Sequence, residues 1–519
     1  MTPDNPLQNL SPRAYQESIF QTAKDFNTLV VLPTGLGKTL ISLMLSIHRM
    51  KQFPAKKILM LAPTRPLVEQ HFQTFKKGLP ELYADIQIFT GSVEAQKRKK
   101  IFQTADIIFS TPQCVWNDLK KYLYSLEDVS LLIIDEAHRC LKNYDYTAVV
   151  NHYKQKAINQ RILGLTASPG SDIPKVKEIC SHLQIEKIEV RTRDSPDVKP
   201  YIKDREFQKV LVPFPTEFQE IKVLLKRVYD KKIEELQSRN LLFGPVNKVT
   251  LLTLQGKLAA KIALKDFNSM YGMTLTAQAI KISHAMELLE TQTLSGLNEY
   301  FQNLLKQAID KKSRAVQFLV KSPEFNAALI SLQSLIAKKI EHPKVEELAA
   351  IVESEFSSNP NSKIIVFSQF RETASTISNR LNLIKNVNSS VFIGQAKKVS
   401  RSGNSTGLSQ KEQKAIIEDF KEGKINVIAS TSIAEEGLDI PEVSAVIFYE
   451  PIPSAIRKIQ RAGRTARLAP GKLIILITED TRDVAFHYAS IAREKKMYKT
   501  IETVKQELDN KPKTLLDFK

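Results

Sequence analysis

The chain has 519 residues, 42% hydrophobic and 25% charged, which is an ordinary globular composition too long for one hydrophobic core, so three or four domains are expected. Its three cysteines are widely spaced, which excludes a disulfide framework and a paired-cysteine zinc site and favours the cytoplasm. The polar N-terminus excludes a secretory signal, and the lack of a long apolar run excludes a membrane span. The formal charge of +19 predicts a polyanionic partner, most simply nucleic acid, although excess lysine also serves solubility.

The first predicted element is a helix within Leu10–Phe20, LSPRAYQESIF. Because they are three residues apart, Arg13 and Gln16 lie on one face of that helix. A glutamine amide donates and accepts at once, so it can pair with the edge of an adenine base. We interpret these two side chains as candidates for reading adenine. The alternative is an ordinary exposed helix face.

A phosphate-binding loop is predicted within Thr28–Thr39, TLVVLPTGLGKT. The apolar run Leu29–Leu32 predicts a strand and Leu40–Met50 a buried helix, so the glycines between them form a strand-to-helix turn. In such a turn, backbone N–H groups approach phosphate oxygens, the lysine reaches the β- and γ-phosphates, and the threonine hydroxyl holds Mg²⁺. Leu32 replaces the usual first glycine, and the alternative is a tight turn with a surface lysine. The predicted nucleotide-binding residues are Pro33, Thr34, Gly35, Leu36, Gly37, Lys38 and Thr39.

Further apolar runs alternate with helical patterns up to Pro169, which predicts a parallel sheet covered on both faces. Each run ends in a polar cluster, and in such sheets function lies at the carboxyl ends of the strands. Thr64, Arg65 and Thr111 lie in these clusters and are donors suited to the phosphates of a nucleic-acid strand, although each position also suits a helix cap. The runs are Lys57–Leu61, Ile86–Phe89, Ile107–Phe109, Leu131–Ile134 and Arg161–Leu165.

Asp135 and Glu136 follow one of these buried runs, within the segment LLIIDEAH. Two carboxylates at a strand end, downstream of a phosphate-binding loop, predict a site of nucleotide hydrolysis. Asp135 would bind Mg²⁺, directly or through water, and Glu136 would orient and deprotonate the attacking water. Adjacent carboxylates at a strand end are common, so this interpretation depends on the loop upstream.

The composition changes near Pro213. From Thr216 to Glu341 glycines are few, strand signals are weak and leucines recur at helical spacing, which predicts a domain of several helices. Its basic clusters are solvated helix faces by default, and a grip on duplex nucleic acid is the sharper alternative. The helical patterns are Phe218–Leu236, Leu251–Phe267 and Leu294–Phe318, and the basic clusters are Lys226–Arg227, Lys231–Lys232 and Lys311–Arg314.

Apolar runs then resume and predict a second parallel sheet. Ser430–Pro441, STSIAEEGLDIP, places hydroxyl and acidic groups at a strand end, and Gln460–Arg467 reads QRAGRTAR. Arg464 and Arg467 are nearly one helical turn apart, so both can act as arginine fingers if the two sheets meet across a nucleotide. Otherwise such a helix is simply solvent-exposed. The runs are Lys363–Phe367, Val391–Ile393, Val427–Ala429, Ala445–Tyr449 and Leu473–Ile477.

Taken together, the segments PTGLGKT, APTRPL, DEAH, TASP, STSIAEEGLDIP and QRAGRTAR occur in the order found in superfamily 2 helicases and translocases. More narrowly, the chain resembles the helicase part of archaeal Hef and the Fanconi anaemia M-type branch-remodelling proteins. The features that carry this resemblance are RAYQ at Arg13–Gln16, DEAHR at Asp135–Arg139, the helical insert between TASP and IIVFSQF, and FIGQA followed by GLSQKEQ. The resemblance extends from about Leu10 to about Arg493.

This resemblance implies an α/β fold with two RecA-like parallel-sheet lobes, an all-helical insert domain between them, and ATP with Mg²⁺ in the cleft. The domains that we predict are the ATP-binding lobe over 1–212, the insert over 213–342, the second lobe over 343–495 and a tail over 496–519. By motif match, the resemblance assigns ATP hydrolysis to Lys38, Thr39, Asp135 and Glu136, and recognition of adenine to Arg13 and Gln16. From the second lobe, Gln460, Arg464 and Arg467 would complete the site, with Asp439 near the ribose. Contacts with the nucleic-acid backbone are assigned to Thr64, Arg65, Thr111, Gln369 and Thr431, and coupling of hydrolysis to lobe movement is assigned to His138 and Thr166–Ser168.

The activity that the resemblance implies is an ATP-dependent DNA helicase or translocase acting on forks and four-way junctions, in fork repair and recombination. In related enzymes the insert helps to recognise branched duplex DNA. One alternative is a double-stranded-RNA translocase like the RNA-sensing helicases and Dicer, which share this insert position. Another is a non-catalytic scaffold that binds junctions and recruits a nuclease, and the intact acids and arginine pair argue against it.

Many archaeal Hef chains continue into an XPF-type nuclease and a helix–hairpin–helix module, whereas this sequence ends at Lys519. We therefore expect any nuclease function to come from a separate partner, and the alternative is that the sequence is trimmed from a longer chain. The ending Pro512–Lys519, PKTLLDFK, resembles a degenerate sliding-clamp-binding peptide through Leu515 and Phe518. Because the expected glutamine and second aromatic are missing, a frayed tail is the preferred interpretation.

Overall fold

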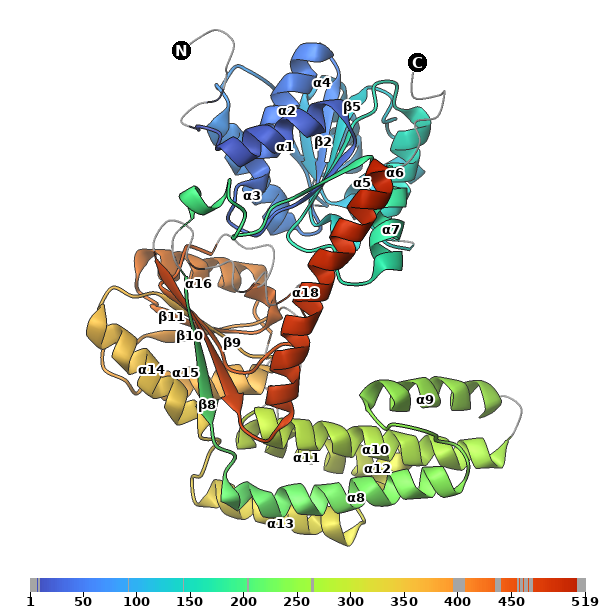
Figure 1. Ribbon diagram of the computed structural model, residues 1–519, viewed down its shortest axis with the longest axis vertical. Helices are drawn as coiled ribbons and strands as arrows, with labels where there is room; N and C mark the ends of the chain where they lie inside the picture. Colours follow the sequence, from blue (N-terminus) through green and yellow to red (C-terminus); the bar gives the residue numbers. More distant parts are fainter. Residues whose placement is uncertain are drawn as a thin grey trace.

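Two all-parallel sheets organise the chain, and a bundle of helices lies beside the second of them (Figure 1). The structure is a computed structural model, and it describes residues 7, 10–91, 93–142, 144–202, 205–262, 266–394, 407–434, 440–454, 457, 461, 465 and 470–510. The predicted fold class, an α/β chain of two RecA-like lobes with an all-helical insert, is confirmed.

The first lobe contains seven parallel strands among the residues described, namely β1 (Thr28–Val31), β2 (Lys57–Leu61), β3 (Ile86–Phe89), β4 (Ile107–Ser110), β5 (Val129–Ile134), β6 (Ile162–Thr166) and β7 (Lys187–Val190). Their order is β3-β4-β2-β5-β6-β1-β7. The strands β1, β2, β4, β5 and β6 are buried along their whole length. Strands covered on both faces need near-continuous apolar side chains, which explains why their sequences read as unbroken apolar runs.

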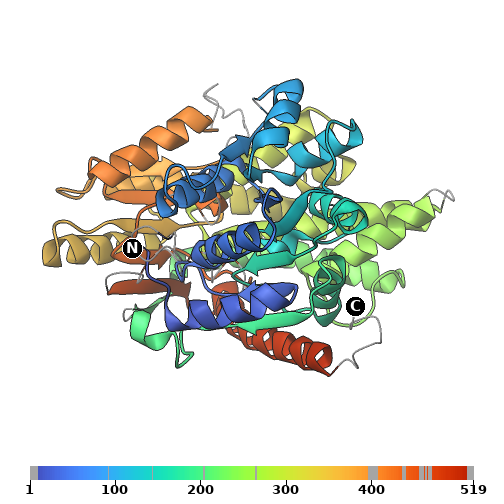
Figure 2. The same ribbon diagram turned by 90° about the horizontal axis from the view of Figure 1, so that it is seen from above.

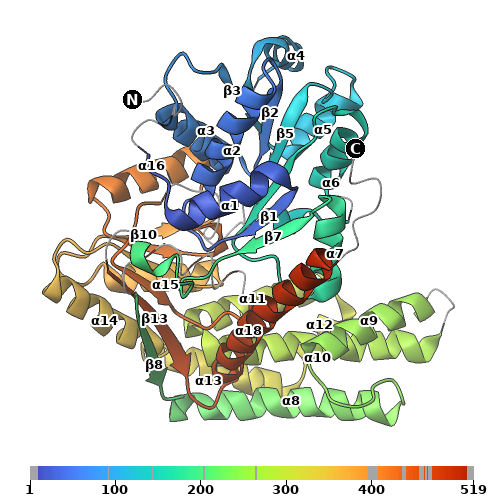
Figure 3. The same ribbon diagram turned by 45° about the horizontal axis from the view of Figure 1, so that its top comes forward.

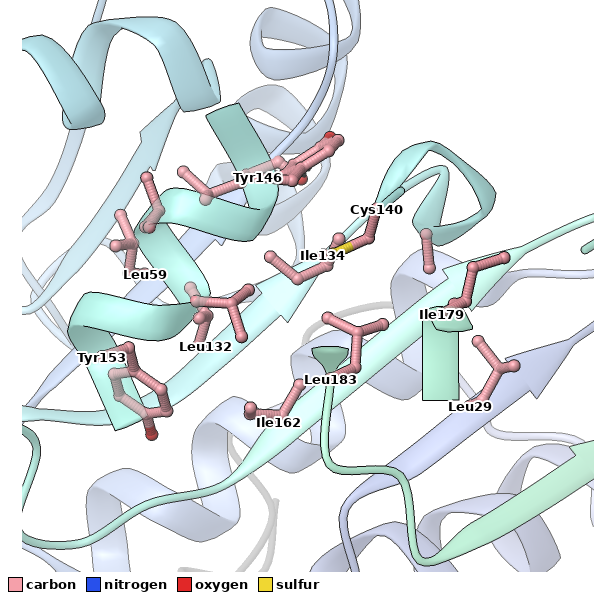
Figure 4. Close-up of a cluster of buried hydrophobic side chains, with 14 of the residues drawn as sticks. Leu29, Leu59, Leu132, Ile134, Cys140, Tyr146, Tyr153, Ile162, Ile179 and Leu183 are labelled. Carbon is pink, nitrogen blue, oxygen red and sulfur yellow. Dashed lines mark hydrogen bonds between the residues drawn. The ribbon is translucent and has the colours of Figure 1, made fainter. Parts of the chain in front are cut away.

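Helices cover both faces of this sheet, namely α1 (Ala14–Asp25), α2 (Lys38–Gln52), α3 (Arg65–Gly78), α4 (Ala95–Thr104), α5 (Pro112–Lys120), α6 (Asp145–Lys156) and α7 (Ile173–His182). Each face has its own hydrophobic core. Leu132 and Ile134 of β5 pack in one core with Tyr146 of α6 (Figure 4), whereas Leu131 and Ile133 belong to the other. This alternation follows from the two-residue period of side chains along a strand.

The insert contains six helices among the residues described, namely α8 (Gln219–Ser238), α9 (Lys248–Ile262), α10 (Phe267–Thr291), α11 (Leu294–Ile309), α12 (Arg314–Leu319) and α13 (Pro323–Ala337). Seen from above, it projects past the lobes on one side (Figure 2). Two predicted helical stretches are interrupted. The pattern Leu294–Phe318 divides into α11 and α12 around Lys311, whose φ of 51° is not helical. The pattern Leu251–Phe267 ends with α9, and α10 begins after Asp266, whose side chain caps it.

The second lobe contains six parallel strands among the residues described, namely β8 (Arg205–Val212), β9 (Ile364–Phe367), β10 (Ser389–Phe392), β11 (Val427–Ser430), β12 (Ala445–Phe448) and β13 (Gly471–Thr478). Their order is β10-β11-β9-β12-β13-β8, and α14 (Lys344–Ser358), α15 (Arg371–Leu381) and α16 (Gln410–Glu422) pack on them. The strand β8 precedes the insert but pairs with β13 along its whole length. The predicted end of the first lobe at residue 212 is therefore wrong, because the second sheet takes its edge strand from before the insert.

The helix α18 (Arg482–Asp509) spans both lobes (Figures 1 and 3). It begins beside β13 and α10, and its C-terminal part packs on α7 and β7. There Met497, Ile501 and Val504 are buried in the core of the first lobe that also contains Tyr146. The predicted tail over 496–519 is therefore wrong as far as Asp509, because this segment is helical and completes the first lobe.

The two lobes also face each other across α3 and α16. The Lys414 ammonium donates to Glu69 Oε2 at 3.1 Å, and Arg65 Nε donates to Glu69 Oε1 at 2.9 Å. The groove between these helices has a volume of about 490 Å³. The lobes are thus linked by the connection from β7 to β8, by α18 and by this polar contact.

Candidate nucleotide site at the strand ends of the first lobe

Three neighbouring strands of the first lobe, β5, β6 and β1, end at the same edge of the sheet. Asp135 and Glu136 follow β5, Thr166 ends β6, and the predicted phosphate loop with Lys38 follows β1. Parallel strands place their carboxyl ends together, so the strand order brings side chains from distant parts of the sequence to one edge. The sequence predicts that Lys38, Asp135 and Glu136 act together in hydrolysis and that Thr166 couples hydrolysis to lobe movement.

The loop between β1 and α2 has a backbone suited to phosphate. Gly35 and Gly37 have φ of 84° and 75°, in the left-handed region that favours glycine. A Cβ at Gly37 would lie 2.3 Å from Gln16 Nε2, so it would displace the end of the Gln16 side chain. Gly37 is the N-cap of α2, and the positive end of this helix therefore faces the loop. The Lys38 ammonium donates to the Leu32 carbonyl oxygen at 2.8 Å, which holds it beside the loop.

Thr39 and Asp135, the predicted Mg²⁺ ligands, share a partner in His71 of α3. The imidazole Nδ1 lies 3.3 Å from Thr39 Oγ1, and Nε2 lies 2.8 Å from Asp135 Oδ2. Burial alone would raise the pKa of Asp135, but the contact with His71 and the charge of Lys38 hold that pKa below its usual value. The Asp135 carboxyl is therefore ionised at neutral pH.

The donor set fits a nucleotide with Mg²⁺. A threonine hydroxyl and an ionised carboxylate supply the hard oxygen ligands that Mg²⁺ prefers. Within the described residues, no group of three His, Cys, Asp or Glu side chains could hold a metal ion by itself, but Mg²⁺ bound with phosphates needs only one or two protein ligands. In the loop, Thr34 Oγ1 is buried with no hydrogen-bond partner among the residues described, which suits a ligand that supplies one.

Glu136 occupies a strained position beside this set. Its φ of 50° and ψ of 49° are left-handed, which is costly for a residue with a Cβ. His138 Nδ1 lies 3.1 Å from Glu136 Oε2, outside hydrogen-bond geometry, and 3.1 Å from Thr166 Oγ1. The Ser168 backbone N–H donates to the same Thr166 hydroxyl at 3.1 Å. These contacts among Glu136, His138, Thr166 and Ser168 thus connect the end of β5 to the segment after β6.

Of the adenine candidates Arg13 and Gln16, at the start of α1, Gln16 contacts the loop. Gln16 is 3% exposed, its Oε1 accepts from the Arg13 N–H at 2.9 Å, and its Nε2 donates to the Leu36 carbonyl at 3.2 Å. The Tyr15 hydroxyl donates to the same carbonyl at 2.8 Å. The Arg13 guanidinium carbon lies 5.4 Å from the ring centroid of Tyr201. Adenine recognition by Gln16 stays a prediction, and it requires the amide to leave these bonds.

The five predicted nucleic-acid contacts form two groups, one on each lobe. Thr64 and Thr111 are the N-cap residues of α3 and α5, but neither side chain makes a capping hydrogen bond. The Arg65 side chain, 46% exposed, begins α3. Gln369 and Thr431 follow the adjacent strands β9 and β11 and line one hollow of about 450 Å³. The structure thus brings the second-lobe pair together, and their contact with nucleic acid stays a prediction.

Some predicted residues lie outside the part of the chain that the structure describes, namely Asp439, Gln460, Arg464, Arg467 and Pro512–Lys519. Arg461, inside the same QRAGRTAR segment, is described and fully buried, with its guanidinium carbon 4.7 Å from the ring centroid of Phe367 on β9. The beginning of the arginine segment is therefore anchored to the second sheet. Completion of the site by the second lobe stays a prediction.

The sequence analysis missed His71. Val68, His71 and Phe75 lie on the buried face of α3. A polar side chain on a buried helix face needs a hydrogen-bond partner, and this was the available signal. The partners Thr39 and Asp135 follow from strand order, which the sequence of α3 does not contain.

Comparisons with known proteins agree with this arrangement. The DEAD/DEAH box helicase family matches residues 13–176, the helicase conserved C-terminal domain matches 343–469, and a helical bundle described for ATP-dependent RNA helicases matches 217–342. The crystal structure of the Pyrococcus furiosus Hef helicase domain is 40% identical and superposes with a TM-score of 0.69, covering 92% of this chain and 98% of its own. MJ1505 of Methanocaldococcus jannaschii, named as an ATP-dependent RNA helicase, is 37% identical over 96% of this chain. The ATP-dependent DNA helicase mph1 of Sclerotinia sclerotiorum is 33% identical over 90% of it.

The two matched domains and the site at the strand ends of the first lobe define a two-lobed helicase of the DEAD/DEAH box class. Within that class, the chain belongs to the superfamily 2 family of archaeal Hef and the Fanconi anaemia group M proteins, and the predicted resemblance is confirmed. The chain spans 61% of the length of MJ1505 and 39% of the length of mph1. Every helix in the described residues is too short or too polar to span a bilayer.

Proposed function

We propose that this chain is an ATP-driven DNA helicase or translocase that acts on branched duplex DNA, forks and four-way junctions, in replication-fork repair and recombination. The observation that carries the proposal is the convergence of Lys38, Thr39, Asp135 and Glu136 on one edge of the first sheet. The family of the chain supports the same activity, because mph1 is named as an ATP-dependent DNA helicase.

In the first lobe, this chain's own side chains account for hydrolysis. Lys38 binds the β- and γ-phosphates of ATP and offsets their charge. Thr39 and Asp135 hold Mg²⁺, which neutralises developing charge on the phosphates when it is bound. Glu136 orients the attacking water and takes its proton, and its Oε2 has no hydrogen-bond partner among the described residues that would compete with that water.

The second lobe completes the site in this proposal when ATP draws the lobes together. Gln460, Arg464 and Arg467 act on the γ-phosphate, with Asp439 near the ribose. Ser168 Oγ lies 2.7 Å from Met497 Sδ on α18, so the segment after β6 contacts the helix that spans both lobes. This contact supports a route from hydrolysis to lobe movement, with release of product reopening the cleft.

Nucleic acid runs across both lobes in this proposal. Thr64, Arg65 and Thr111 contact the backbone from the first lobe, and Gln369 and Thr431 contact it from the second. The insert grips the duplex through exposed basic residues, and the net charge of +19 supports a polyanionic partner. The exposed basic residues on α8 are Lys226, Arg227 and Lys231.

Protein partners and location belong to the same proposal. A separate nuclease would cleave the junctions that this chain remodels, and a sliding clamp would bind the segment Pro512–Lys519. The three cysteines, Cys114, Cys140 and Cys180, are free and buried, which suits a reducing cytoplasm.

A double-stranded-RNA translocase is the second candidate, because MJ1505 and the helical-bundle family are both named for RNA helicases. The test is ATP hydrolysis measured with single strands, duplexes, forks and four-way junctions of both DNA and RNA. The proposal predicts the strongest stimulation by branched DNA. Stronger stimulation by RNA duplex favours the second candidate, and binding of junctions without any hydrolysis indicates a scaffold.

Two substitutions test the assigned chemistry. Lys38→Ala removes the phosphate-binding cation, and Glu136→Gln removes the general base while keeping its shape. Loss of a general base costs roughly 10²–10⁴-fold in rate, so we expect DNA-stimulated hydrolysis to fall by at least about 100-fold. Junction binding in the absence of ATP should survive in both variants. Hydrolysis at the wild-type rate in either variant would show that the site is misassigned.

A further inference from the structure

His71 is placed where an ordinary core histidine would not be. It comes from α3, its exposed fraction is 6%, and both of its ring nitrogens contact residues from other strand ends. Thr39 follows β1 and Asp135 follows β5, and these strands are separated in the sheet by β6. One imidazole thus joins two side chains that come from separate strand ends.

The chemistry of the partners assigns the tautomer of this ring. An ionised carboxylate only accepts hydrogen bonds, so Nε2 carries the proton and donates it to Asp135 Oδ2. Nδ1 lies 3.3 Å from Thr39 Oγ1, and where it carries no proton it accepts from the Thr39 hydroxyl. In that tautomer the hydroxyl hydrogen points to the imidazole, and the lone pairs of Thr39 Oγ1 remain for a cation. Both partners are left as oxygen ligands in fixed orientations.

We propose that His71 is a positioning residue that holds Thr39 and Asp135 in the geometry needed to bind Mg²⁺ together with the phosphates of ATP. The proposal rests on the proposed function, because it assumes that these two residues are the Mg²⁺ ligands. Groups that orient metal ligands through hydrogen bonds commonly affect metal affinity by 10- to 100-fold. His71 touches neither ATP nor water in this role and acts through its two partners.

Three substitutions separate the two hydrogen bonds of the ring. His71→Phe keeps the ring volume and removes both bonds. His71→Gln places an amide donor near the position of Nε2, toward Asp135, and His71→Asn places an acceptor near the position of Nδ1, toward Thr39. His152→Phe is the matched control, because His152 is partly buried on α6 of the same lobe. Melting temperatures of all four variants establish that they fold.

The measurement is equilibrium binding of a fluorescent ATP analogue to the full chain, first in EDTA and then across a Mg²⁺ titration. Mg²⁺ should strengthen binding of the analogue, and we call the Mg²⁺ concentration that gives half of this effect the Mg²⁺ midpoint. In His71→Phe we expect the Mg²⁺ midpoint to rise on the order of 10- to 100-fold, with binding of the analogue in EDTA unchanged. His71→Gln and His71→Asn should fall between Phe and wild type, and His152→Phe should match wild type. If His71→Phe does not fold, the same comparison with His71→Gln and His71→Asn decides.

The outcomes separate this inference from the proposed function. The positioning role is wrong if Mg²⁺ strengthens analogue binding in the wild type and the Mg²⁺ midpoint of every folded His71 variant stays within about twofold of the wild-type midpoint. If weakening in His71→Phe is equally large in EDTA, the ring is a structural support of the loop and the inference also fails. If the wild type itself gains nothing from Mg²⁺, the assignment of Thr39 and Asp135 fails first.

Discussion

Asp135 and Glu450 occupy corresponding places in the two lobes, and their environments are opposite. Each follows the fourth strand in the order of its sheet, β5 in the first and β12 in the second, and each is almost fully buried. Beside Asp135, His71 and Lys38 lower the pKa of the carboxyl despite its burial. Burial raises the pKa of Glu450 to about 8, although the charges of Lys344 and Arg461 act against it.

This difference shows that one edge of the same fold serves two purposes. In the first lobe the strand ends hold an ionised carboxylate in contact with donors, ready for a cation. In the second lobe the strand ends lie against the insert, where Lys344 donates to the Thr291 carbonyl at 2.7 Å and to Asp483 Oδ2 at 2.8 Å. Thr291 ends α10 and Asp483 lies in the first turn of α18, so this buried polar group joins the insert to the second lobe.

Among substitutions that test this difference between the lobes, Lys344→Met should cause the largest loss of stability. Lys344 and Asp483 are both fully buried, and removal of one partner leaves an uncompensated buried charge. We expect a loss of about 3–5 kcal/mol in the stability of the second lobe and insert, measured by urea denaturation with a fluorescent reporter on the insert. The double variant Lys344→Met with Asp483→Asn should recover part of it. A loss below about 1 kcal/mol would contradict the role of this pair.

The two carboxyls should also differ in their response to pH. The pKa of Glu450 is about 8 in the folded chain and about 4.3 when unfolded, so the folded state keeps a proton that the unfolded chain releases between these values. Its contribution to stability is complete below pH 4.3 and is lost as the pH rises to 8, by at most about 1.4 kcal/mol per pH unit. In Glu450→Gln, melting temperatures from pH 5.5 to 8.5 should therefore fall less than in the wild type. Parallel curves for the two proteins would rule out a raised pKa at Glu450.

The smallest effect is expected at the surface of the other lobe. Lys177 of α7 and Glu507 of α18 form an ion pair at 2.6 Å, with both side chains about half exposed. Such pairs contribute roughly 0.2–1 kcal/mol and are screened by salt. Lys177→Met should therefore lower stability by less than about 1 kcal/mol, and the difference should vanish in 1 M salt. A larger loss would mean that charge, not apolar packing, holds α18 on the first lobe.

Local patterns in the sequence were sufficient for much of the fold. The unbroken apolar run of β5 predicts a buried parallel strand, and the glycines before Lys38 predict the turn that the structure contains. The sequence analysis did not predict the strand β8, and its domain boundary at residue 212 left these residues in the first lobe. The strand is an edge strand with exposed Phe207 and Leu211, and nothing in its own pattern specifies which sheet it joins. An edge strand can pair with the exposed edge of another sheet, and its partner strand is distant in sequence.

The same limit applies to the site. Asp135 could be predicted because it lies directly after the buried strand β5, and Thr39 because it follows the glycine turn at the start of α2. His71 could not, because its partners are 32 and 64 residues away in sequence and become neighbours only through the order of β1, β6 and β5. The contact of Met497 with Ser168, 329 residues apart, has the same origin.

The path of α18 has a consequence for biosynthesis. Met497, Ile501 and Val504 fill the core of the lobe that begins the chain, but a ribosome makes them after the second lobe and the insert. Domains commonly fold as they emerge, in order from the N-terminus. The first lobe therefore leaves the ribosome with part of its core uncovered, and that core closes only after the insert and the second lobe have been made.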